Sequence, residues 1–159
     1  MRVLVAYASR RGGTAGLAAM IGDAFAARGW EVDVCRAAVV HDIGGYDAVV
    51  VASALYLNRW LGEAKRFVRR HAGALRERPV WFVSSGPLSA HTETATPPTV
   101  RRLMSTVNAR AHMTFGGYLS TDAPGMLAHA MARSQAGDYR DAEQVRAWVS
   151  DVLCSIDDP

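Results

Sequence analysis

The stretch RVLVAYASRRGGTAGLAAMIGDAFAARG, residues 2–29, decides the fold of this chain. Residues 2–8 form an apolar run rich in valine, which is typical of a strand that is buried on both faces. Residues 15–28 carry apolar side chains at helical spacing, and Gly29 follows where a left-handed cap would end the helix. The stretch therefore predicts a strand, a polar loop with glycines, and a helix.

The loop between this strand and this helix has the features of an anion-binding site. It contains Ser9, Arg10, Arg11, Gly12, Gly13 and Thr14. The two glycines let the backbone bend so that several N–H groups point inward, while the two hydroxyls add donors and the two arginines add charge. The helix N-terminus adds about half a positive charge. The alternative is a tight turn with a threonine N-cap and two exposed arginines, because Gly-Gly-Thr is also common capping chemistry.

Three other phosphate-binding loops do not fit this stretch. A Walker loop needs a lysine before its Ser or Thr, whereas Gly13 precedes Thr14 here. The dinucleotide fingerprint needs Gly-x-Gly-x-x-Gly, and the spacing of Gly12, Gly13 and Gly16 differs from it. A low-molecular-weight phosphatase needs a cysteine in this loop, and the loop has none. A hydroxyl-rich loop for a monophosphate remains.

Length and composition favour one cytoplasmic globular domain spanning residues 1–159. Half of the residues are apolar and 21% are charged, and no apolar run approaches the ~20 residues of a membrane-spanning helix. Met1 and Arg2 lead straight into the first strand, so we expect no signal peptide. Cys35 and Cys154 form no CxxC motif and are interpreted as thiols in a reducing compartment.

The rest of the chain alternates strands with helices. We expect further strands at residues 31–35, 48–54, 79–84 and 112–119, and helices at residues 61–71, 99–108 and 141–156. This alternation predicts an α/β fold, a doubly wound parallel sheet with helices on both faces. Ligands of such sheets bind beyond the carboxyl ends of the strands. The first loop should therefore share its ligand with the loops after the third and fourth strands.

Both of those loops carry side chains suited to a flat ring. The segment after the third strand contains Ser53, Ala54, Leu55, Tyr56, Leu57, Asn58 and Trp60. Tyr56 and Trp60 offer flat apolar faces for stacking, and a turn at residues 57–58 is expected because Asn tolerates left-handed backbone. The alternative for the two aromatics is a surface pair packed on the next helix. The segment after the fourth strand offers a hydroxyl and backbone amides to a polar ring edge, and it contains Ser84, Ser85, Gly86, Pro87 and Leu88.

The first loop and its flanks resemble the flavodoxin family. The residues that match the family's signature are Val5, Tyr7, Ser9, Gly12, Thr14, Ala18 and Ile21. In that family the loop wraps the phosphate of FMN. The resemblance therefore implies a flavodoxin-like five-stranded sheet in the order 2-1-3-4-5 with non-covalent FMN, while another flavin or a deazaflavin remains an open alternative.

Three longer segments are similar to flavodoxin-domain proteins related to bacterial menaquinone-dependent protoporphyrinogen dehydrogenase. They are residues 47–71, 80–88 and 137–148. This resemblance implies that the first loop holds the FMN phosphate and that residues 53–60 and 84–88 hold the ring. It also implies an FMN-dependent oxidoreductase that passes electrons between a small organic substrate and a quinone or similar acceptor. The alternative is a flavodoxin-type electron carrier without a substrate of its own; in both cases the flavin carries the chemistry.

The charge pattern bears on the partners of this chain. Its net charge of +3 is opposite to the strongly acidic balance typical of flavodoxins that shuttle electrons. A basic cluster at residues 65–78 contains Lys65, Arg66, Arg69, Arg70, Arg76 and Arg78. It is interpreted either as a solvated face or as a surface for anionic lipid, which would make the protein membrane-peripheral, or for an acidic partner. Nucleic acid is not expected because no aromatics are interleaved, and the five histidines show no metal-ligand spacing.

Overall fold

The computed structural model describes residues 1–10, 12–86, 95–116 and 127–158, with only the backbone of residues 127–141. Its strands are β1 (Arg2–Ala8), β2 (Glu31–Arg36), β3 (Ala48–Tyr56), β4 (Arg59–Trp60), β5 (Val80–Ser85) and β6 (Ala111–Phe115). Its helices are α1 (Gly13–Ala26), α2 (Gly62–Arg70), α3 (Ala72–Arg76), α4 (Pro98–Val107) and α5 (Leu127–Asp157), with a 3₁₀ turn η1 (Ala37–Val39). Within these ranges, no helix combines the length and the apolar character needed to cross a bilayer.

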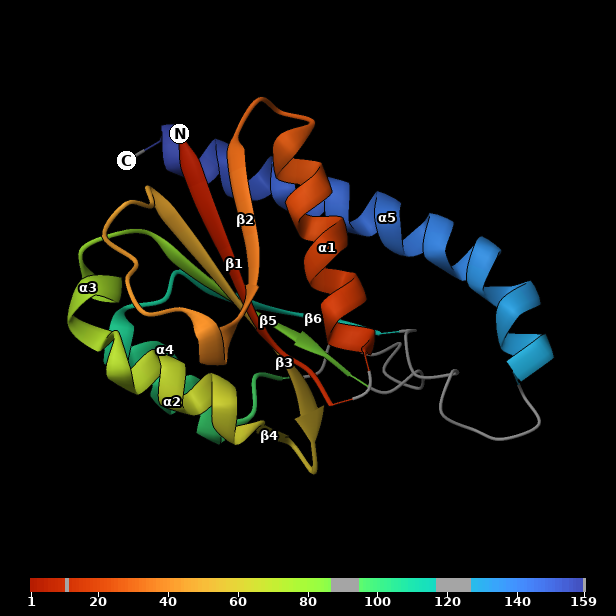
Figure 1. Ribbon diagram of the computed structural model, residues 1–159, viewed down its shortest axis with the longest axis horizontal. Helices are drawn as coiled ribbons and strands as arrows, with labels where there is room; N and C mark the ends of the chain where they lie inside the picture. The colour runs from red at the N-terminus through yellow and green to blue at the C-terminus, as the bar shows by residue number, and fades with distance from the viewer. Residues whose placement is uncertain (11, 87–94, 117–126, 159) are drawn as a thin grey trace.

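The long strands form one parallel sheet in the order β2-β1-β3-β5-β6 (Figure 1). Counted without the short β4, this is the predicted order 2-1-3-4-5, which is confirmed. The central strands β1, β3 and β5 are apolar on both faces because helices cover both sides of the sheet. Strand β4 is different, since it pairs antiparallel with the end of β3.

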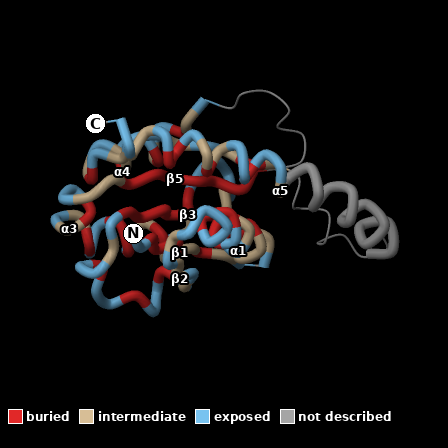
Figure 2. Tube along the Cα trace, turned by 90° about the horizontal axis from the view of Figure 1, so that it is seen from above, coloured by how far each residue is buried: buried red, intermediate tan, exposed pale blue. Residues whose placement is uncertain are grey.

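Two apolar cores lie on the two faces of the sheet, as Figure 2 shows in the buried strands between the helical layers. On one face, alternate residues of β1 such as Val3 and Val5 pack with Phe25 of α1 and Val149 of α5. On the other face, Leu4 and Ala6 belong to the core that contains residues of α2, α3 and α4. This sandwich places the ends of β1, β3 and β5 at one common edge.

The predicted cap at Gly29 is confirmed by its φ of 87°. This left-handed backbone lets the Trp30 amide donate to the Phe25 carbonyl oxygen at 3.2 Å, which ends the helix and turns the chain into β2. Figure 1 shows α1 alongside β1 and β2, running back across the sheet.

Several predicted boundaries were wrong. Helix α5 begins at Leu127 rather than at residue 141, because the alanine-rich sequence that follows Gly125 consists largely of good helix formers. Strand β3 continues to Tyr56, and β4, α3 and η1 were not predicted. Strand β6 is described from Ala111 to Phe115, and residues 117–119 of the predicted strand lie outside the described residues.

Candidate functional site

The first loop leaves β1 at Ala8 and opens α1 at Gly13, at the carboxyl edge of the sheet. Gly12 has a φ of 87°, a left-handed conformation that glycine adopts without steric penalty, and a Cβ added there would meet nothing within 4 Å. The Ser9 hydroxyl oxygen accepts a hydrogen bond from the Gly12 amide at 3.0 Å and holds the turn closed. Arg11, the remaining predicted residue of this loop, lies outside the described residues.

The N-terminus of α1 has the electrostatics of an anion site. No described side chain caps this helix, and no acidic residue lies in its first turn. The first amides of a helix have no partner within the helix, and they carry the positive end of its dipole. Arg10 is exposed beside them. The arrangement suits a small dianion. Phosphate binding by Ser9, Arg10, Gly12 and Gly13 stays a prediction.

Thr14 has a structural contact as well as its predicted role. The residue is 2% exposed, and its hydroxyl lies 2.8 Å from the hydroxyl of Ser85 in a hydrogen bond that either group could donate. This bond joins the first loop to the end of β5 across the sheet edge. If Ser85 donates, the Thr14 proton stays available to a ligand at the helix N-terminus.

The segment after β3 folds back as a tight hairpin. Tyr56 pairs with Arg59, and the two residues between them have left-handed backbone, with φ values of 51° for Leu57 and 60° for Asn58. Two positive φ values make this a turn of type I′, which suits a two-residue hairpin. The predicted turn at these positions is confirmed. The Asn58 carbonyl oxygen accepts a 3.3 Å hydrogen bond from Thr99, so α4 supports the hairpin tip.

The two aromatics of this hairpin have different surroundings. Tyr56 is 59% exposed, and the Arg10 guanidinium lies 5.2 Å from the centre of its ring. Trp60 is only 3% exposed, and its ring packs against Phe82 at 4.6 Å between centroids. The Trp60 ring thus belongs mainly to the core, as the alternative of packing within the fold implies, and its predicted stacking on a ligand stays a prediction. Tyr56 keeps a face free for stacking.

The remaining residues of the hairpin segment hold the local fold. The Ser53 hydroxyl donates to the Ala54 carbonyl oxygen at 3.0 Å and accepts from the Leu61 amide at 3.1 Å. It thereby fixes the start of α2 against β3. Ala54 and Leu55 are half-buried in β3. Ser53 was predicted as a ligand contact, and in the structure its hydroxyl bonds to two backbone groups, so its ligand role stays a prediction.

The predicted ring-edge segment starts inside the sheet. Ser84 and Ser85 are buried residues of β5 whose hydroxyls bond to other side chains, and the Gly86 amide donates to the Phe115 carbonyl oxygen at 2.9 Å. These groups are therefore engaged within the protein, and their predicted contact with a ring edge stays a prediction. Pro87 and Leu88 lie outside the described residues.

A chain of hydrogen bonds under the site involves His112, which sequence reasoning missed. The Trp60 indole N–H donates to the Ser84 hydroxyl oxygen at 2.8 Å, Ser84 lies 2.7 Å from Nε2 of His112, and Nδ1 of His112 lies 3.0 Å from the Thr96 hydroxyl. A neutral imidazole has one N–H and one acceptor nitrogen, so one ring nitrogen donates and the other accepts along this chain of bonds. Burial lowers the pKa of His112 to about 4, so the ring is neutral. In the sequence, only the position of His112 in a predicted strand indicated that this histidine could be buried.

An open hollow of about 510 Å³ lies between the first loop and the hairpin. Its lining comprises Arg10, Tyr56, Leu57, Arg59, Trp60, Leu61, Gly62 and Lys65. Three of these residues are cationic and none is acidic. The hollow therefore lies between the first loop and the segment after β3. The segment after β5 is connected to both by the Thr14–Ser85 and Trp60–Ser84 hydrogen bonds. Among the residues that the structure describes, no cluster of three metal-ligating side chains occurs.

Comparison with known proteins points to one family. A family model described as a flavodoxin domain matches residues 4–134. Among curated proteins, a sequence search finds no match.

Solved structures with the same fold include several flavodoxins. The flavodoxin of Streptococcus pneumoniae TIGR4 has a TM-score of 0.66 and 16% identity, with 98% of this chain and 99% of that one covered. A short-chain flavodoxin associated with a bacterial microcompartment has a TM-score of 0.67 and 13% identity, with 98% of each chain covered. A flavodoxin from the domain Archaea has a TM-score of 0.59 and 18% identity, with 92% of this chain and 99% of that one covered. At these identities the likeness shows the fold.

Proposed function

This chain belongs to the flavodoxin-domain family, and from that premise we propose that it binds FMN at the carboxyl edge of its sheet and transfers electrons. One observation carries the proposal. The uncapped N-terminus of α1, with Gly12 and Arg10 beside it, lies at the same edge as the exposed ring of Tyr56. An anion site next to an apolar ring face is what a phosphate-bearing flat cofactor requires.

The residues at this edge fit FMN. The amides at the start of α1 would take the phosphate, and the open space around Gly12 leaves room for it. Tyr56 would stack on the ring, and Arg10 lies between the two positions. The bound flavin supplies the redox chemistry, so the protein needs no nucleophile of its own. The Thr14–Ser85 and Trp60–Ser84 hydrogen bonds would hold the first loop and the hairpin in place against β5.

The test compares FMN with riboflavin, which has the same ring and no phosphate. We expect FMN to bind far more tightly than riboflavin, as measured by the quenching of flavin fluorescence on titration with protein. The substitution R10Q should weaken FMN several-fold and riboflavin little, whereas R28Q, the same change at another exposed arginine, should weaken neither. Y56A should weaken both ligands. Equal affinity for FMN and riboflavin would refute the phosphate site.

The electron-carrier role is the form of this proposal that the flavodoxin-like neighbours favour. A carrier exchanges single electrons with protein partners, so a potentiometric titration of the FMN complex should resolve two one-electron potentials. The potential-dependent spectra provide the readout, and no substrate is needed.

A second candidate function is the oxidation of an organic substrate with a quinone or similar acceptor, as in the protoporphyrinogen-dehydrogenase-related group. The observation that favours it is the basic lining of the hollow, which differs from the acidic surface typical of electron shuttles. It predicts one two-electron step in the same titration and reduction of a soluble quinone analogue by the reduced protein. Two well-separated potentials would exclude it.

A further inference from the structure

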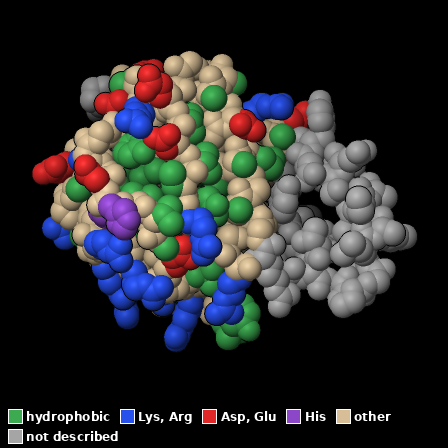
Figure 3. All heavy atoms as spheres, viewed as in Figure 1, with side chains coloured by type: hydrophobic (Ala, Val, Ile, Leu, Met, Phe, Trp, Pro, Cys, Tyr) green, Lys and Arg blue, Asp and Glu red, His purple; other side chains and the backbone are tan. Residues whose placement is uncertain are grey.

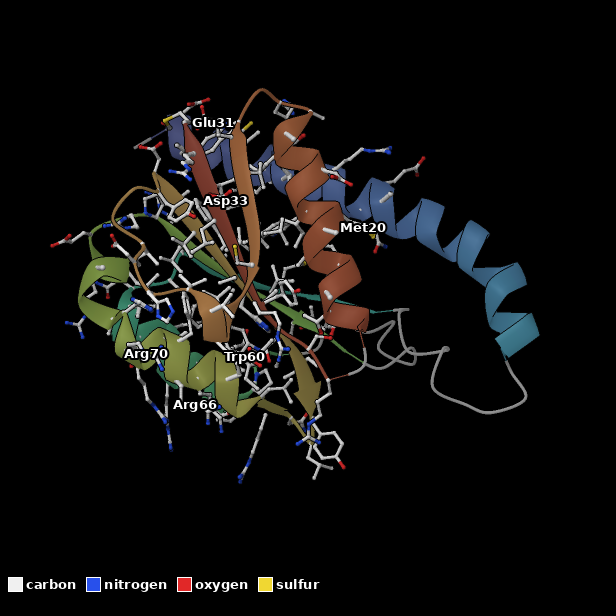
Figure 4. The ribbon with its side chains drawn as sticks, in the orientation of Figure 1. Met20, Glu31, Asp33, Trp60, Arg66 and Arg70 are labelled. Atoms are coloured by element: carbon white, nitrogen blue, oxygen red, sulfur yellow. The ribbon has the colours of Figure 1, made fainter. Side chains whose placement is uncertain are left out.

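A continuous basic surface runs from the first loop along α2. We define the basic rim as Arg10, Arg59, Lys65, Arg66, Arg69 and Arg70. All are exposed except Lys65, which is half-exposed, and none forms an ion pair with an acidic residue that the structure describes. In Figure 3 the Lys and Arg side chains gather over α2 and the hairpin. In Figure 4, Arg66 and Arg70 point away from the fold, while Glu31 and Asp33 lie at the opposite end of the sheet.

Two residues of the predicted basic cluster do not belong to this surface. Arg76 donates to the Thr106 carbonyl oxygen at 2.7 Å. Arg78 donates to the carbonyl oxygens of Ala74, Ile43 and Tyr46. Both arginines therefore hold elements of the fold together. We therefore leave both out of the basic rim, which Arg10 and Arg59 extend toward the hairpin and the hollow.

An apolar side chain projects from one end of the basic rim. Leu57 is 82% exposed at the tip of the β3–β4 hairpin. Its left-handed backbone is unfavourable for a leucine, whereas Asn, Asp or Gly would fit this turn. The chain thus places a large apolar group, at some conformational cost, where it contacts solvent.

We propose that the basic rim and Leu57 dock this protein on an anionic lipid bilayer. The cations would lie at the headgroup phosphates, which attract clusters of four to eight Lys and Arg residues. Leu57 would enter the boundary between headgroups and acyl chains. A convex tip of this kind favours a bilayer over an acidic protein, because a fluid surface accommodates a protruding side chain without a matching pocket. The hollow beside Tyr56 would then open close to the membrane surface.

The experiment is co-sedimentation of the FMN-supplemented full chain with lipid vesicles. One set contains equal parts of phosphatidylglycerol and phosphatidylcholine, and the other contains phosphatidylcholine alone. We expect binding to the anionic set only, and its loss at about 1 M salt, where the Debye length is about 3 Å. The proposed contacts do not involve FMN, so we expect the same binding without added FMN, and this result is separable from the flavin test.

Two variants and one control assign the binding to this surface. R66Q/R70Q should lower the partition coefficient about 30-fold, since each cation near an anionic membrane contributes about fivefold. The control R28Q/R146Q removes the same charge from two exposed positions, one in the turn after α1 and one on α5, and should change little. L57N should lower binding about tenfold. The Asn-Asn turn relieves the backbone strain, so loss of folding cannot explain a loss of binding in this variant.

Three outcomes would overturn the proposal. The first is the absence of wild-type binding to anionic vesicles at low salt. The second is equal weakening by R66Q/R70Q and R28Q/R146Q, which would indicate a response to net charge alone. The third is unchanged binding of L57N, because Leu57 then stays outside the bilayer. In that case the basic rim is an electrostatic surface that suits an acidic protein instead.

Discussion

Acid should destabilise this fold through His112. The pKa of this ring is about 4 in the fold, against 6.5 for an ordinary histidine, because burial opposes its charge. Between these values the unfolded chain binds a proton that the folded chain does not, so stability falls as the pH falls through this window. Without solvent screening, this shift would lower the free energy of unfolding by about 2 kcal/mol between neutral pH and pH 5. Because the ring is only half-buried, we discount this for solvent screening to about 1 kcal/mol.

The assay is urea unfolding followed by tryptophan fluorescence at pH 7.5, 6 and 5, with wild type and H112Q side by side. Glutamine does not titrate but can still hydrogen-bond Ser84. H112Q should be the less stable protein at pH 7.5, and its deficit should shrink by about 1 kcal/mol at pH 5. His71, whose pKa is also lowered by burial, titrates in both proteins and cancels in the difference. A deficit that is constant across this range would refute the reasoning.

Three further substitutions test contacts at the site by the same unfolding assay. G12A should destabilise the fold by about 1–2 kcal/mol through backbone strain alone, because its Cβ meets no atom. G12N should destabilise it less, since Asn tolerates left-handed backbone, and equal effects would contradict this origin. T14V should destabilise by about 1–3 kcal/mol by leaving the Ser85 hydroxyl buried without its partner, while T14S should restore most of the loss; if T14S and T14V are alike, the hydroxyl is irrelevant. W60F should destabilise by about 1–2 kcal/mol through the lost indole donor to Ser84, and a neutral result would remove that bond from the account.

The fold could be predicted because its signals are local. The valine-rich β1 and β3 must be buried on both faces, and this forces helices onto both sides of a parallel sheet. Gly12 and Gly29 occupy left-handed positions that follow from their places at the two ends of α1. The start of α5 was harder, since the sequence of residues 127–141 has no strong apolar stripe and only its helix propensity favours a helix.

The hydrogen-bond partners at the site could not be predicted, because they come from distant parts of the chain. Ser84 and Ser85 were predicted at the end of the fourth strand, facing a ligand, and their hydroxyls bond to Trp60 and Thr14. A buried hydroxyl needs a partner, but the sequence does not say which one it finds. His112 illustrates the same limit, since its two ring nitrogens meet groups from β5 and from the segment before α4.

The burial of Trp60, in contrast, could have been predicted from the sequence, because the turn at residues 57–58 was expected and it determines which residues of the hairpin share a face. A two-residue turn at Leu57 and Asn58 makes Tyr56 the partner of Arg59 and Leu55 the partner of Trp60. Cross-strand partners share a face of the ribbon, and neighbours along a strand lie on opposite faces. Tyr56 and Trp60 therefore had to point in opposite directions, so that one ring is exposed and the other packs in the core. Because Arg59 shares the outer face with Tyr56, the geometry that buries Trp60 also places a cation beside the exposed ring.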